Sequence, residues 1–256
     1  MRALVDVESL IYKAAVATED LIQSKSDKDL YTTFYRVSKG KEYLDNVLND
    51  IMGVTGSDKY LLVLGSSRNF RKVINPTYKA NRSLIKPHPM VSILKKEFMA
   101  THPYYYIDWL EADDTVRILY EEDPFNNIVV SIDKDLKTFP CSIYNPDKPD
   151  DGVVKVSAKD AVASFMKQLL MGDTTDGYKG LPGVGPSTAT KILSDMSEPD
   201  IEHIKTIYEE KSSFIDFCNV YNMARIISKK DYFEGSGIKL YKGYFDFEKG
   251  ERVERL

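Results

Sequence analysis

The sequence has 256 residues, 43% of them hydrophobic, and its 35 Lys and Arg against 39 Asp and Glu give a formal net charge of −4. No apolar run approaches the roughly 18 residues that a membrane-spanning helix needs, and the apolar start at Ala3–Val5 is broken at once by Asp6 and Glu8, unlike a signal peptide. Cys141 and Cys218 lie far apart, which excludes a disulfide framework and suits a reducing compartment. We therefore expect a soluble cytoplasmic protein, large enough for one domain or two lobes.

The hydrophobic pattern of the first 157 residues predicts buried strands that alternate with helices. The expected strands are Arg2–Val7, Tyr60–Leu64, Tyr104–Ile107 and Asn127–Ile132, and the expected helices are Ser9 to about Ser24, Glu42–Met52 and Ala112–Glu122. Prolines at 76, 87 and 89 predict a loop or broken helices over residues 76–90. Val153–Val156 is expected to pair with Ser142–Tyr144 at a sheet edge. This alternation predicts an α/β fold with a mostly parallel sheet.

After Ser157 the pattern changes to one of helices. They are expected at Ala158–Met171, Pro186–Ser194, His203–Ile207 and Phe214–Ile227. From Ile238 to Val253 the chain resembles short strands that turn at Glu248–Gly250. We therefore expect a sheet lobe over residues 1–157, a helical lobe over residues 158–227 and a tail over residues 228–256.

Acidic residues follow the predicted strands at the points where those strands end. They are Asp6 at the carboxyl end of the first strand, Glu111, Asp113 and Asp114 after the third, and Asp133 and Asp135 after the fourth. In an open α/β sheet the carboxyl ends of the strands form the ligand crevice. Asp173 and Asp176 add an acidic pair after the first helix of the helical lobe. Any one of these acids is most simply a helix cap or a solvated loop end, but their joint placement favours a shared site.

Carboxylates crowded in one crevice repel one another, and a hard cation relieves that repulsion. Mg²⁺ and Mn²⁺ prefer oxygen ligands, and a pair of such ions suits phosphoryl chemistry. The histidines (His88, His102 and His203) and the cysteines are not spaced as a zinc site, and no Gly-x-Ser-x-Gly motif occurs. The acidic residues therefore predict a site for Mg²⁺ or Mn²⁺.

One segment of the acidic chain is strongly basic. Residues 68–96 contain no Asp or Glu, and their basic residues are Arg68, Arg71, Lys72, Lys79, Arg82, Lys86, Lys95 and Lys96. Most charge runs are solvated surfaces, but the absence of acids here favours a site for a polyanion.

A glycine-rich turn, Gly183-Val-Gly185, precedes the helix predicted to begin at Pro186 or Ser187. Exposed backbone N–H groups at a helix start bind phosphate, and Lys191 one turn further on can reinforce this. Such contacts are independent of base sequence. The alternative interpretation is an ordinary packing turn between two helices.

These motifs together resemble those of the 5′-nuclease family, which includes flap endonucleases, the 5′-nuclease domain of bacterial DNA polymerase I and bacteriophage 5′-exonucleases. Met171–Leu193 resembles the helix–three-turn–helix signature of that family, and Glu111-Ala-Asp-Asp114 and Ser131-Ile-Asp-Lys-Asp135 resemble its central acidic motifs. Phe70-Arg71 followed by Tyr78-Lys-Ala-Asn-Arg82 is similar to the segment that enters its helical arch, which would span about residues 71–100 here. The resemblance implies a PIN- or resolvase-like sheet with a helical lobe that carries the helix–three-turn–helix motif.

Carried over residue by residue, the resemblance implies two metal ions. Asp6, Glu111, Asp113 and Asp133 would surround the first ion, Asp135, Asp173 and Asp176 would serve the second, and Asp114 would ligate directly or from one sphere further out. Lys79 and Arg82 would reach the scissile phosphate. Arg71 would contact the substrate, and Tyr78 would stack on a terminal or unpaired base. Gly183, Gly185, Ser187 and Lys191 would hold duplex phosphates, with K⁺ or Na⁺ bound at the turn.

The sequence departs from the family at Ser66, where relatives place an Asp just after the second strand. A neutral hydroxyl is a poorer metal ligand, which puts the first metal site in doubt. Asp108 and Glu8 are nearby acids, and the pattern favours neither as a substitute. The arch is short, as in a phage-type exonuclease that acts on a free 5′ end.

We therefore expect a metal-dependent 5′-3′ exonuclease that acts as a monomer on duplex DNA with a 5′ end, a nick or a flap. RNA in RNA–DNA hybrids is a further expected substrate, the membrane is not a partner, and a phage-encoded protein would act in the host cytoplasm. Two alternatives stay open: a non-catalytic DNA-binding factor with a vestigial site, and a metal-dependent RNA nuclease on a similar sheet.

Overall fold

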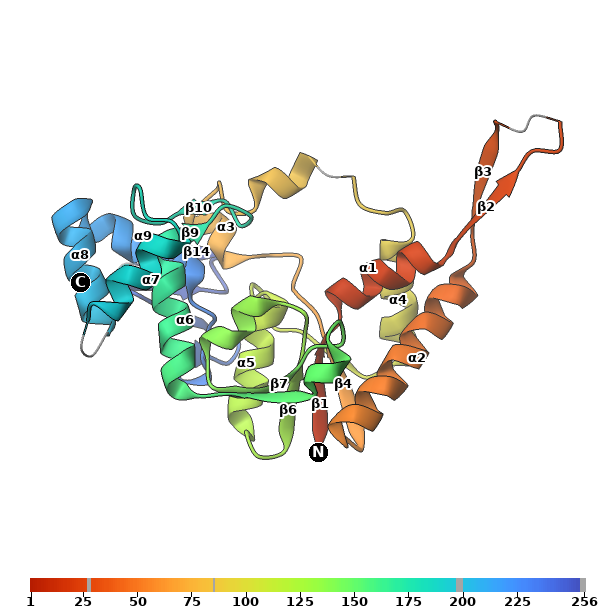
Figure 1. Ribbon diagram of the computed structural model, residues 1–256, viewed down its shortest axis with the longest axis horizontal. Coiled ribbons are helices and arrows are strands. Elements are labelled where there is room, and N and C mark those ends of the chain that lie inside the picture. The colour runs from red at the N-terminus through yellow and green to blue at the C-terminus, as the bar shows by residue number, and fades with distance from the viewer. Residues whose placement is uncertain (27–28, 85, 197–199, 254–256) are drawn as a thin grey trace.

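A six-stranded sheet in the order β5-β4-β1-β6-β7-β8 lies at the centre of the computed structural model, which describes residues 1–26, 29–84, 86–196 and 200–253 (Figure 1). Its strands are β1 (Arg2–Asp6), β4 (Lys59–Val63), β5 (Tyr104–Tyr105), β6 (Asn127–Val130), β7 (Cys141–Tyr144) and β8 (Val153–Val156). The first five are parallel, and β8 runs antiparallel to β7. The expected mostly parallel sheet and its edge pairing are confirmed.

Helices cover both faces of the sheet. Successive residues of β1 point to opposite sides, and because they are all apolar from Ala3 to Val5, both faces need covering. Ala3 and Val5 pack with Leu44 and Phe98 on one face, and Leu4 packs with Val116 on the other. The first face is covered by α1 (Glu8–Ala17), α2 (Val37–Thr55) and α4 (Val91–Thr101), and the second by α5 (Ala112–Glu122) (Figure 1). These helices therefore cover the two faces of the sheet and not the edge formed by the carboxyl ends of its strands.

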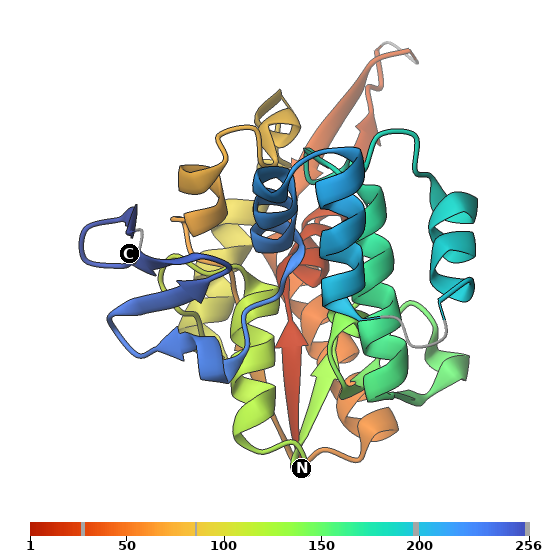
Figure 2. The same ribbon diagram turned by 90° about the vertical axis from the view of Figure 1, so that its left-hand side faces the viewer.

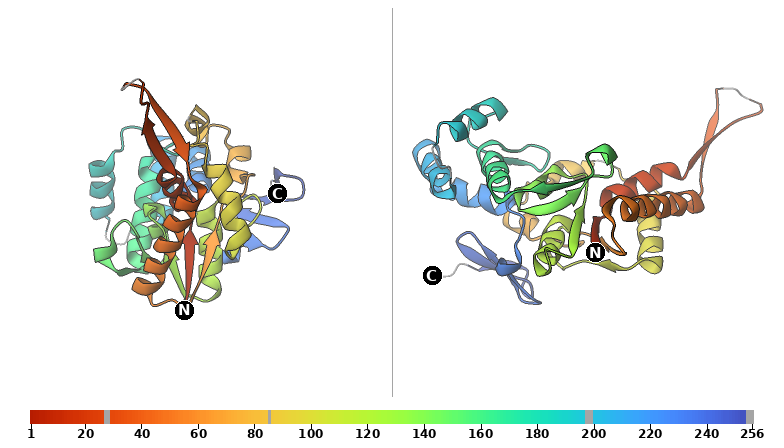
Figure 3. Two further views of the ribbon diagram at one scale, coloured as in Figure 1. Left: turned by 90° about the vertical axis from the view of Figure 1, so that its right-hand side faces the viewer. Right: turned by 60° about the horizontal axis from the view of Figure 1, so that its bottom comes forward.

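The helix expected from Ser9 to Ser24 is only partly present. It ends at Ala17, and β2 (Glu19–Gln23) pairs antiparallel with β3 (Tyr31–Tyr35) to form a two-stranded ribbon that projects from the body (Figure 3). Tyr31-Thr-Thr-Phe-Tyr35 is rich in aromatic and β-branched residues, which favour a strand. The local helical pattern was overridden because this strand, later in the chain, pairs with residues 19–23.

Between β4 and β5, residues 64–84 and 86–103 are described, and α3 (Phe70–Ile74) and the 3₁₀ helix η1 (Ala80–Leu84) lie above the carboxyl ends of the strands (Figure 1). Together with α4 they form separate helices, as the prolines of this segment predicted. We call residues 71–100 the arch.

The helical lobe begins after β8 and packs beside the sheet (Figure 2). It contains α6 (Ala158–Met171), a small hairpin of β9 (Gly172–Asp173) and β10 (Tyr178–Lys179), α7 (Pro186–Ser194), α8 (Ile201–Lys211) and α9 (Phe214–Ala224). Leu169, Tyr208 and Phe217 are fully buried in its core. No helix in the described ranges is long and apolar enough to cross a membrane.

The chain then forms a four-stranded antiparallel sheet, confirming the expected short strands. Its strands are β11 (Tyr232–Phe233), β12 (Gly237–Leu240), β13 (Gly243–Asp246) and β14 (Glu251–Val253). Three further 3₁₀ helices lie elsewhere along the described chain: η2 (Lys134–Thr138), η3 (Pro149–Asp151) and η4 (Lys229–Asp231). Ile238 and Phe245 pack against Phe70 of α3 and Ile118 of α5. This C-terminal sheet therefore supports α3, where the arch begins, and α5, which carries Asp113 and Asp114.

Candidate active site

A cavity of about 530 Å³ opens at the carboxyl ends of β1 and β6. Eight acidic residues line it, together with the basic residues Lys79 and Arg82: Asp6, Glu8, Glu111, Asp113, Asp133, Asp135, Asp173 and Asp176. The structure therefore brings together seven of the eight acids predicted from the sequence, and it adds Glu8.

The hydroxyl of Ser131 organises the acids at the ends of the two central strands. Asp6 is the last residue of β1, and its Oδ2 accepts a hydrogen bond of 2.9 Å from Ser131 Oγ. Ser131 Oγ itself accepts from the backbone N–H of Asp133 at 3.0 Å. Asp133 in turn caps η2 by accepting from Asp135 N at 2.8 Å. Ser131 is buried and was not singled out from the sequence, although it lies within the quoted acidic motif.

Several of these carboxyl groups have raised pKa values. Burial, opposed by the Ser131 hydrogen bond and reinforced by Glu8 and Asp133, raises the pKa of Asp6 to about 7. Burial, with the charges of Asp6 and Asp133, raises the pKa of Asp113 well above its usual range. Burial and the neighbouring Asp133 raise the pKa of Asp135 to about 6. The acids therefore repel one another within a water-poor site.

This donor set fits a hard divalent cation, because it consists of oxygens whose mutual repulsion a positive ion would relieve. Over the ranges that the structure describes, no three carboxylate, histidine or cysteine side chains converge into a preassembled metal cage.

Glu111 differs from these acids because basic and hydroxyl groups surround it. Its Oε1 accepts from Lys79 Nζ at 2.5 Å, and its Oε2 accepts from Tyr78 Oη at 2.7 Å and from Arg71 Nη1 at 3.1 Å. Burial raises the pKa of Glu111, but Arg71 and Lys79 outweigh it and lower this pKa to about 2. Glu111 therefore keeps its negative charge.

The base of the arch is docked onto the β9–β10 turn. Lys79 N donates to Asp176 O at 2.7 Å, and Asn81 Nδ2 donates to Thr175 O at 3.1 Å. Burial lowers the pKa of Lys79, but Glu111 and Asp176 raise it above the usual value. Arg82 Nη2 lies 2.8 Å from Asp176 Oδ1. Two positive charges from the arch thus face the acidic cavity.

Tyr78 is not available to stack on a base, so that prediction is wrong for this structure. Its side chain is buried, and its ring stacks on Tyr178 with 6.3 Å between centroids and 20° between planes. Its hydroxyl lies 2.7 Å from Glu111 Oε2 and 3.1 Å from Asp176 Oδ2. Burial between the two lobes makes Tyr78 a support for the carboxylates.

Asp114 and Arg71 pair with each other inside the protein, so that Arg71 differs from its predicted role as a substrate contact. Asp114 is fully buried, and its two oxygens accept from Arg71 at 2.6 and 2.8 Å. Those oxygens also accept from the backbone of Ile227 at 2.8 Å and of Glu111 at 3.2 Å, the latter completing a capping box. Both carboxylate oxygens of Asp114 are thus engaged within the protein. Its position at the third residue of α5, after Glu111, was a sequence signal for a capping role.

Arg71 cannot contact substrate in this structure, because only 3% of its side chain is exposed. Besides Asp114 and Glu111, it donates to the carbonyls of Met223 at 3.1 Å and Arg225 at 2.7 Å. Arg71 therefore ties the start of the arch and α5 to the C-terminal end of α9.

Ser66, where the family carries an Asp, does not line the cavity. Its Oγ donates to Asp108 Oδ1 at 2.7 Å, and Asp108 also accepts from Arg68 Nε at 3.0 Å. Glu8 instead reaches the end of β4, where its Oε1 accepts from Gly65 N at 3.2 Å. Of the two acids considered for this position, Glu8 is the one at the cavity.

The glycine-rich turn lies outside this cavity, at the start of α7. Gly183 has a φ of +74°, a conformation that favours glycine, and Gly185 is the N-cap residue. Ser187 and Lys191 are exposed on the helix that follows. The structure thus gathers the four residues on one exposed surface, next to a helix start without a side-chain cap.

No family model matches the chain. It is 30% identical over 214 residues to a 5′-3′ exonuclease of Buchnera aphidicola subsp. Schizaphis graminum, covering 74% of this chain and 68% of that protein. It is 27% identical to the exonuclease of Escherichia phage T7, covering 57% and 51%. It is 26% identical to DNA polymerase I of Rhizobium leguminosarum, covering 87% of this chain but only 23% of the polymerase.

Among solved structures, the fold is similar to that of the T5 5′-exonuclease with bound divalent zinc ions. The TM-score is 0.59 at 15% identity, and the match covers 87% of this chain and 89% of the other. This agreement concerns the fold, a mixed α/β structure around a mostly parallel sheet. With the sequence relationship to the Buchnera exonuclease, it establishes that the chain belongs to the 5′-nuclease family.

Proposed function

We propose that the protein is a divalent-metal-dependent 5′-3′ exonuclease that hydrolyses phosphodiester bonds of duplex DNA from 5′ ends. The observation that carries the proposal is that eight acids face Lys79 and Arg82 within one cavity. The relatives named 5′-3′ exonuclease and exonuclease support it, as does the fold shared with a metal-bound T5 5′-exonuclease.

Two Mg²⁺ or Mn²⁺ ions would be held by the acids of the cavity. Asp6, Glu111, Asp113 and Asp133 would hold the first, with Glu8 at its margin, and Asp135, Asp173 and Asp176 would hold the second. When bound, such ions supply charge neutralisation, an acidified water and stabilisation of the attacking and leaving oxygens. Ser131 fixes the directions in which Asp6 and Asp133 present their oxygens.

Lys79 and Arg82 would stabilise the negative charge that develops on the phosphate during cleavage. Lys79 is held by Glu111 and Asp176, and its φ of +53° lies in a region that few non-glycine residues adopt. Its raised pKa keeps it positively charged. The backbone at the base of the arch thus directs a permanent charge to the cavity.

The surface of Gly183, Gly185, Ser187 and Lys191 would hold duplex phosphates independently of base sequence. In this proposal the turn forms the helix–three-turn–helix motif and binds K⁺ or Na⁺. The proposed substrates include nicked and flapped duplexes and RNA–DNA hybrids, and the acting species is a monomer.

Cleavage of a 5′-labelled duplex in Mg²⁺ and in chelator tests the proposal. We expect cleavage with metal alone, and we expect Asp133→Asn and Asp173→Asn to lower the rate at least about 10³-fold while DNA binding persists in a gel-shift assay. Asp147→Asn, an exposed acid paired with Lys13, is the control and should keep full activity. Undiminished cleavage by both cavity variants would refute the proposal, and comparison of DNA, RNA and hybrid substrates identifies the polymer cut.

A further inference from the structure

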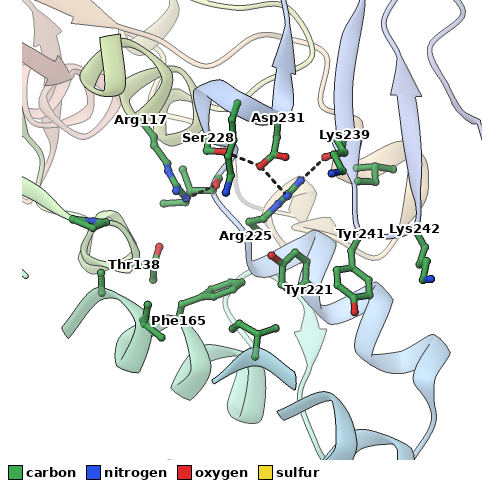
Figure 4. Close-up of a pocket in the computed structure, with 17 residues that line it drawn as sticks. Arg117, Thr138, Phe165, Tyr221, Arg225, Ser228, Asp231, Lys239, Tyr241 and Lys242 are labelled. Carbon is green, nitrogen blue, oxygen red and sulfur yellow. Dashed lines mark hydrogen bonds and ion pairs between the residues drawn. The ribbon is translucent and has the colours of Figure 1, made fainter. Parts of the chain in front are cut away.

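A second cavity, of about 700 Å³, lies between α6, α9 and the β12–β13 turn (Figure 4). No residue lines both this cavity and the catalytic one. Phe165 lies in its wall, and roughly 9 Å of helix separate Phe165 from the end of α6 that leads to Asp173. The two cavities are therefore distinct.

Positive charge predominates in this second cavity. Its ionised lining residues are Arg117, Arg225, Lys230, Lys239, Lys242 and a single acid, Asp231. Asp231 Oδ2 is already engaged, since it accepts from Arg225 Nη1 at 3.1 Å and from Ser228 Oγ at 2.7 Å. The three lysines are exposed and form no ion pair with any residue that the structure describes. An anionic ligand would be attracted to this excess of positive charge.

Aromatic rings form the wall beside these charges. Figure 4 shows the rings of Phe165, Tyr221 and Tyr241 grouped next to Arg225. The centroids of Tyr221 and Tyr241 are 4.7 Å apart, and those of Phe165 and Tyr221 are 5.4 Å apart. All three rings are only partly buried. A partly buried aromatic wall next to basic groups suits a ligand that carries both a planar ring and an anion.

Two of the basic residues reach this cavity from different elements, Arg225 from the end of α9 and Lys242 from the turn between β12 and β13. Arg225 donates to Asp231 and to the carbonyl of Lys239, but its buried Nε has no hydrogen-bond partner among the described residues. Lys242, in the β12–β13 turn, has a φ of +58°, which non-glycine residues rarely adopt. That turn places Lys242 beside Tyr241 at the cavity (Figure 4).

We propose that this second cavity binds a nucleoside 5′-monophosphate, with the base against the aromatic wall and the phosphate near Arg225 and the lysines. Nucleotides combine a planar ring with a phosphate, which matches the two halves of the lining. They are also the products that the proposed exonuclease would release, so the choice of this ligand rests on the proposed function.

Calorimetric titration of the full chain with thymidine 5′-monophosphate in EDTA tests the inference without nuclease turnover. The test variant combines Lys230→Gln, Lys239→Gln and Lys242→Gln, which alters exposed side chains only. We expect it to weaken binding at least tenfold. Lys59→Gln, Lys211→Gln and Lys249→Gln, also exposed, form the matched control and should bind as the unmodified protein does. Thermal melting verifies that both triple variants fold.

A second comparison separates this site from the catalytic cavity. Lys79→Ala combined with Arg82→Ala removes the catalytic cations, and this variant should retain binding of thymidine 5′-monophosphate. Thymidine alone and inorganic phosphate alone should each bind at least tenfold more weakly than the nucleotide. A short oligothymidylate should compete no better than the mononucleotide.

The inference is overturned if the nucleotide does not bind, if binding is lost with Lys79 and Arg82 instead of the three lysines, or if phosphate alone binds equally well. An oligothymidylate that binds through the three lysines while the mononucleotide does not would make this a strand site. Duplex cleavage is measured separately with Asp133→Asn. Failure of nucleotide binding thus leaves the proposed function standing, and loss of the proposed function leaves the binding result intact.

Discussion

At the scale of single residues, the acidic edge contains carboxylates with different roles. Asp6, Asp113 and Asp135 have raised pKa values and face the cavity, whereas Asp114 is saturated by Arg71. The difference arises from what surrounds each group. A buried carboxylate with a bidentate guanidinium partner is satisfied, while carboxylates that face one another need a cation.

We expect Arg71→Lys to destabilise the protein by about 2–4 kcal/mol, because a lysine cannot replace the bidentate pair with buried Asp114. Urea unfolding measures this effect. Arg68→Lys is the control, since Arg68 also pairs with an aspartate but is 53% exposed, and it should cost less than about 1 kcal/mol. Equal losses of stability in the two variants would show that the buried pair of Arg71 with Asp114 contributes no more than the exposed pair of Arg68 does.

The pH dependence of stability has an identifiable contribution from His102. Burial, opposed by Asp45 and assisted by Lys41, lowers the pKa of His102, whose Nδ1 lies 2.8 Å from Tyr60 Oη. Because the folded-state pKa is below the ordinary value of 6.5, this contribution is present above pH 6.5 and is lost as the pH falls towards the folded-state pKa. His102→Gln should therefore reduce the loss of stability between pH 7 and pH 5. Identical profiles for His102→Gln and the unmodified protein would contradict the assignment.

At the scale of elements, the contact between the arch and the β9–β10 turn sets the geometry of the cavity. Gly177 allows the close approach, because a Cβ atom there would lie 2.6 Å from the carbonyl oxygen of Thr77. The same contact holds the backbone of Lys79 against Asp176. The arch base and the turn that carries Asp173 and Asp176 are therefore one mechanical unit.

We expect Gly177→Ala to lower the cleavage rate and to destabilise the protein more than Gly56→Ala does. Both glycines have positive φ values, +77° and +62°, so both substitutions carry a backbone penalty of about 1–2 kcal/mol. Gly56 has open space around it, whereas Gly177 meets the arch, which should add at least about 1 kcal/mol. Urea unfolding and initial rates on a labelled duplex measure the two effects. An equal response of both variants would mean that the arch adjusts freely.

At the scale of the whole molecule, the C-terminal sheet packs behind α3 and α5, next to the acidic cavity. Phe245 is fully buried, with ring centroids 5.9 Å from Phe70 and 5.3 Å from Trp109. Phe70 begins the helix that carries Arg71, and Trp109 precedes Glu111 by two residues. Packing of the last strands is thus transmitted to the base of the arch and the start of α5.

We expect Phe245→Ala to lower the free energy of unfolding by about 3–5 kcal/mol and to reduce cleavage, because the space left by the ring would loosen the packing behind α3 and α5. Phe125→Ala is a matched control at a side chain that is 92% exposed, and it should change stability by less than about 0.5 kcal/mol. Thermal unfolding and cleavage rates measure both variants. Full activity in a destabilised Phe245→Ala protein would confine the sheet to a role in stability.

The sheet and the acids at its edge were predictable because their signals are local. Asp6 and Asp133 follow continuous apolar strands, and such strands pair in parallel with their carboxyl ends at one edge. The helix expected beyond Ala17 was wrong because residues 19–23 pair with Tyr31–Tyr35. Strand pairing depends on a partner elsewhere in the chain, which a window of neighbouring residues does not contain.

By itself the sequence determined the α/β architecture, the family and the acids that converge on one edge. Tertiary structure alone decided that Arg71 and Asp114 support the site, that Tyr78 is buried against Tyr178, and that Glu8 reaches the end of β4. Those roles depend on burial and on partners up to 154 residues away, such as the carbonyl of Arg225 that Arg71 binds. Charge and spacing identify a carboxylate or a guanidinium, but the groups that fold around it decide whether it meets a ligand or the protein interior.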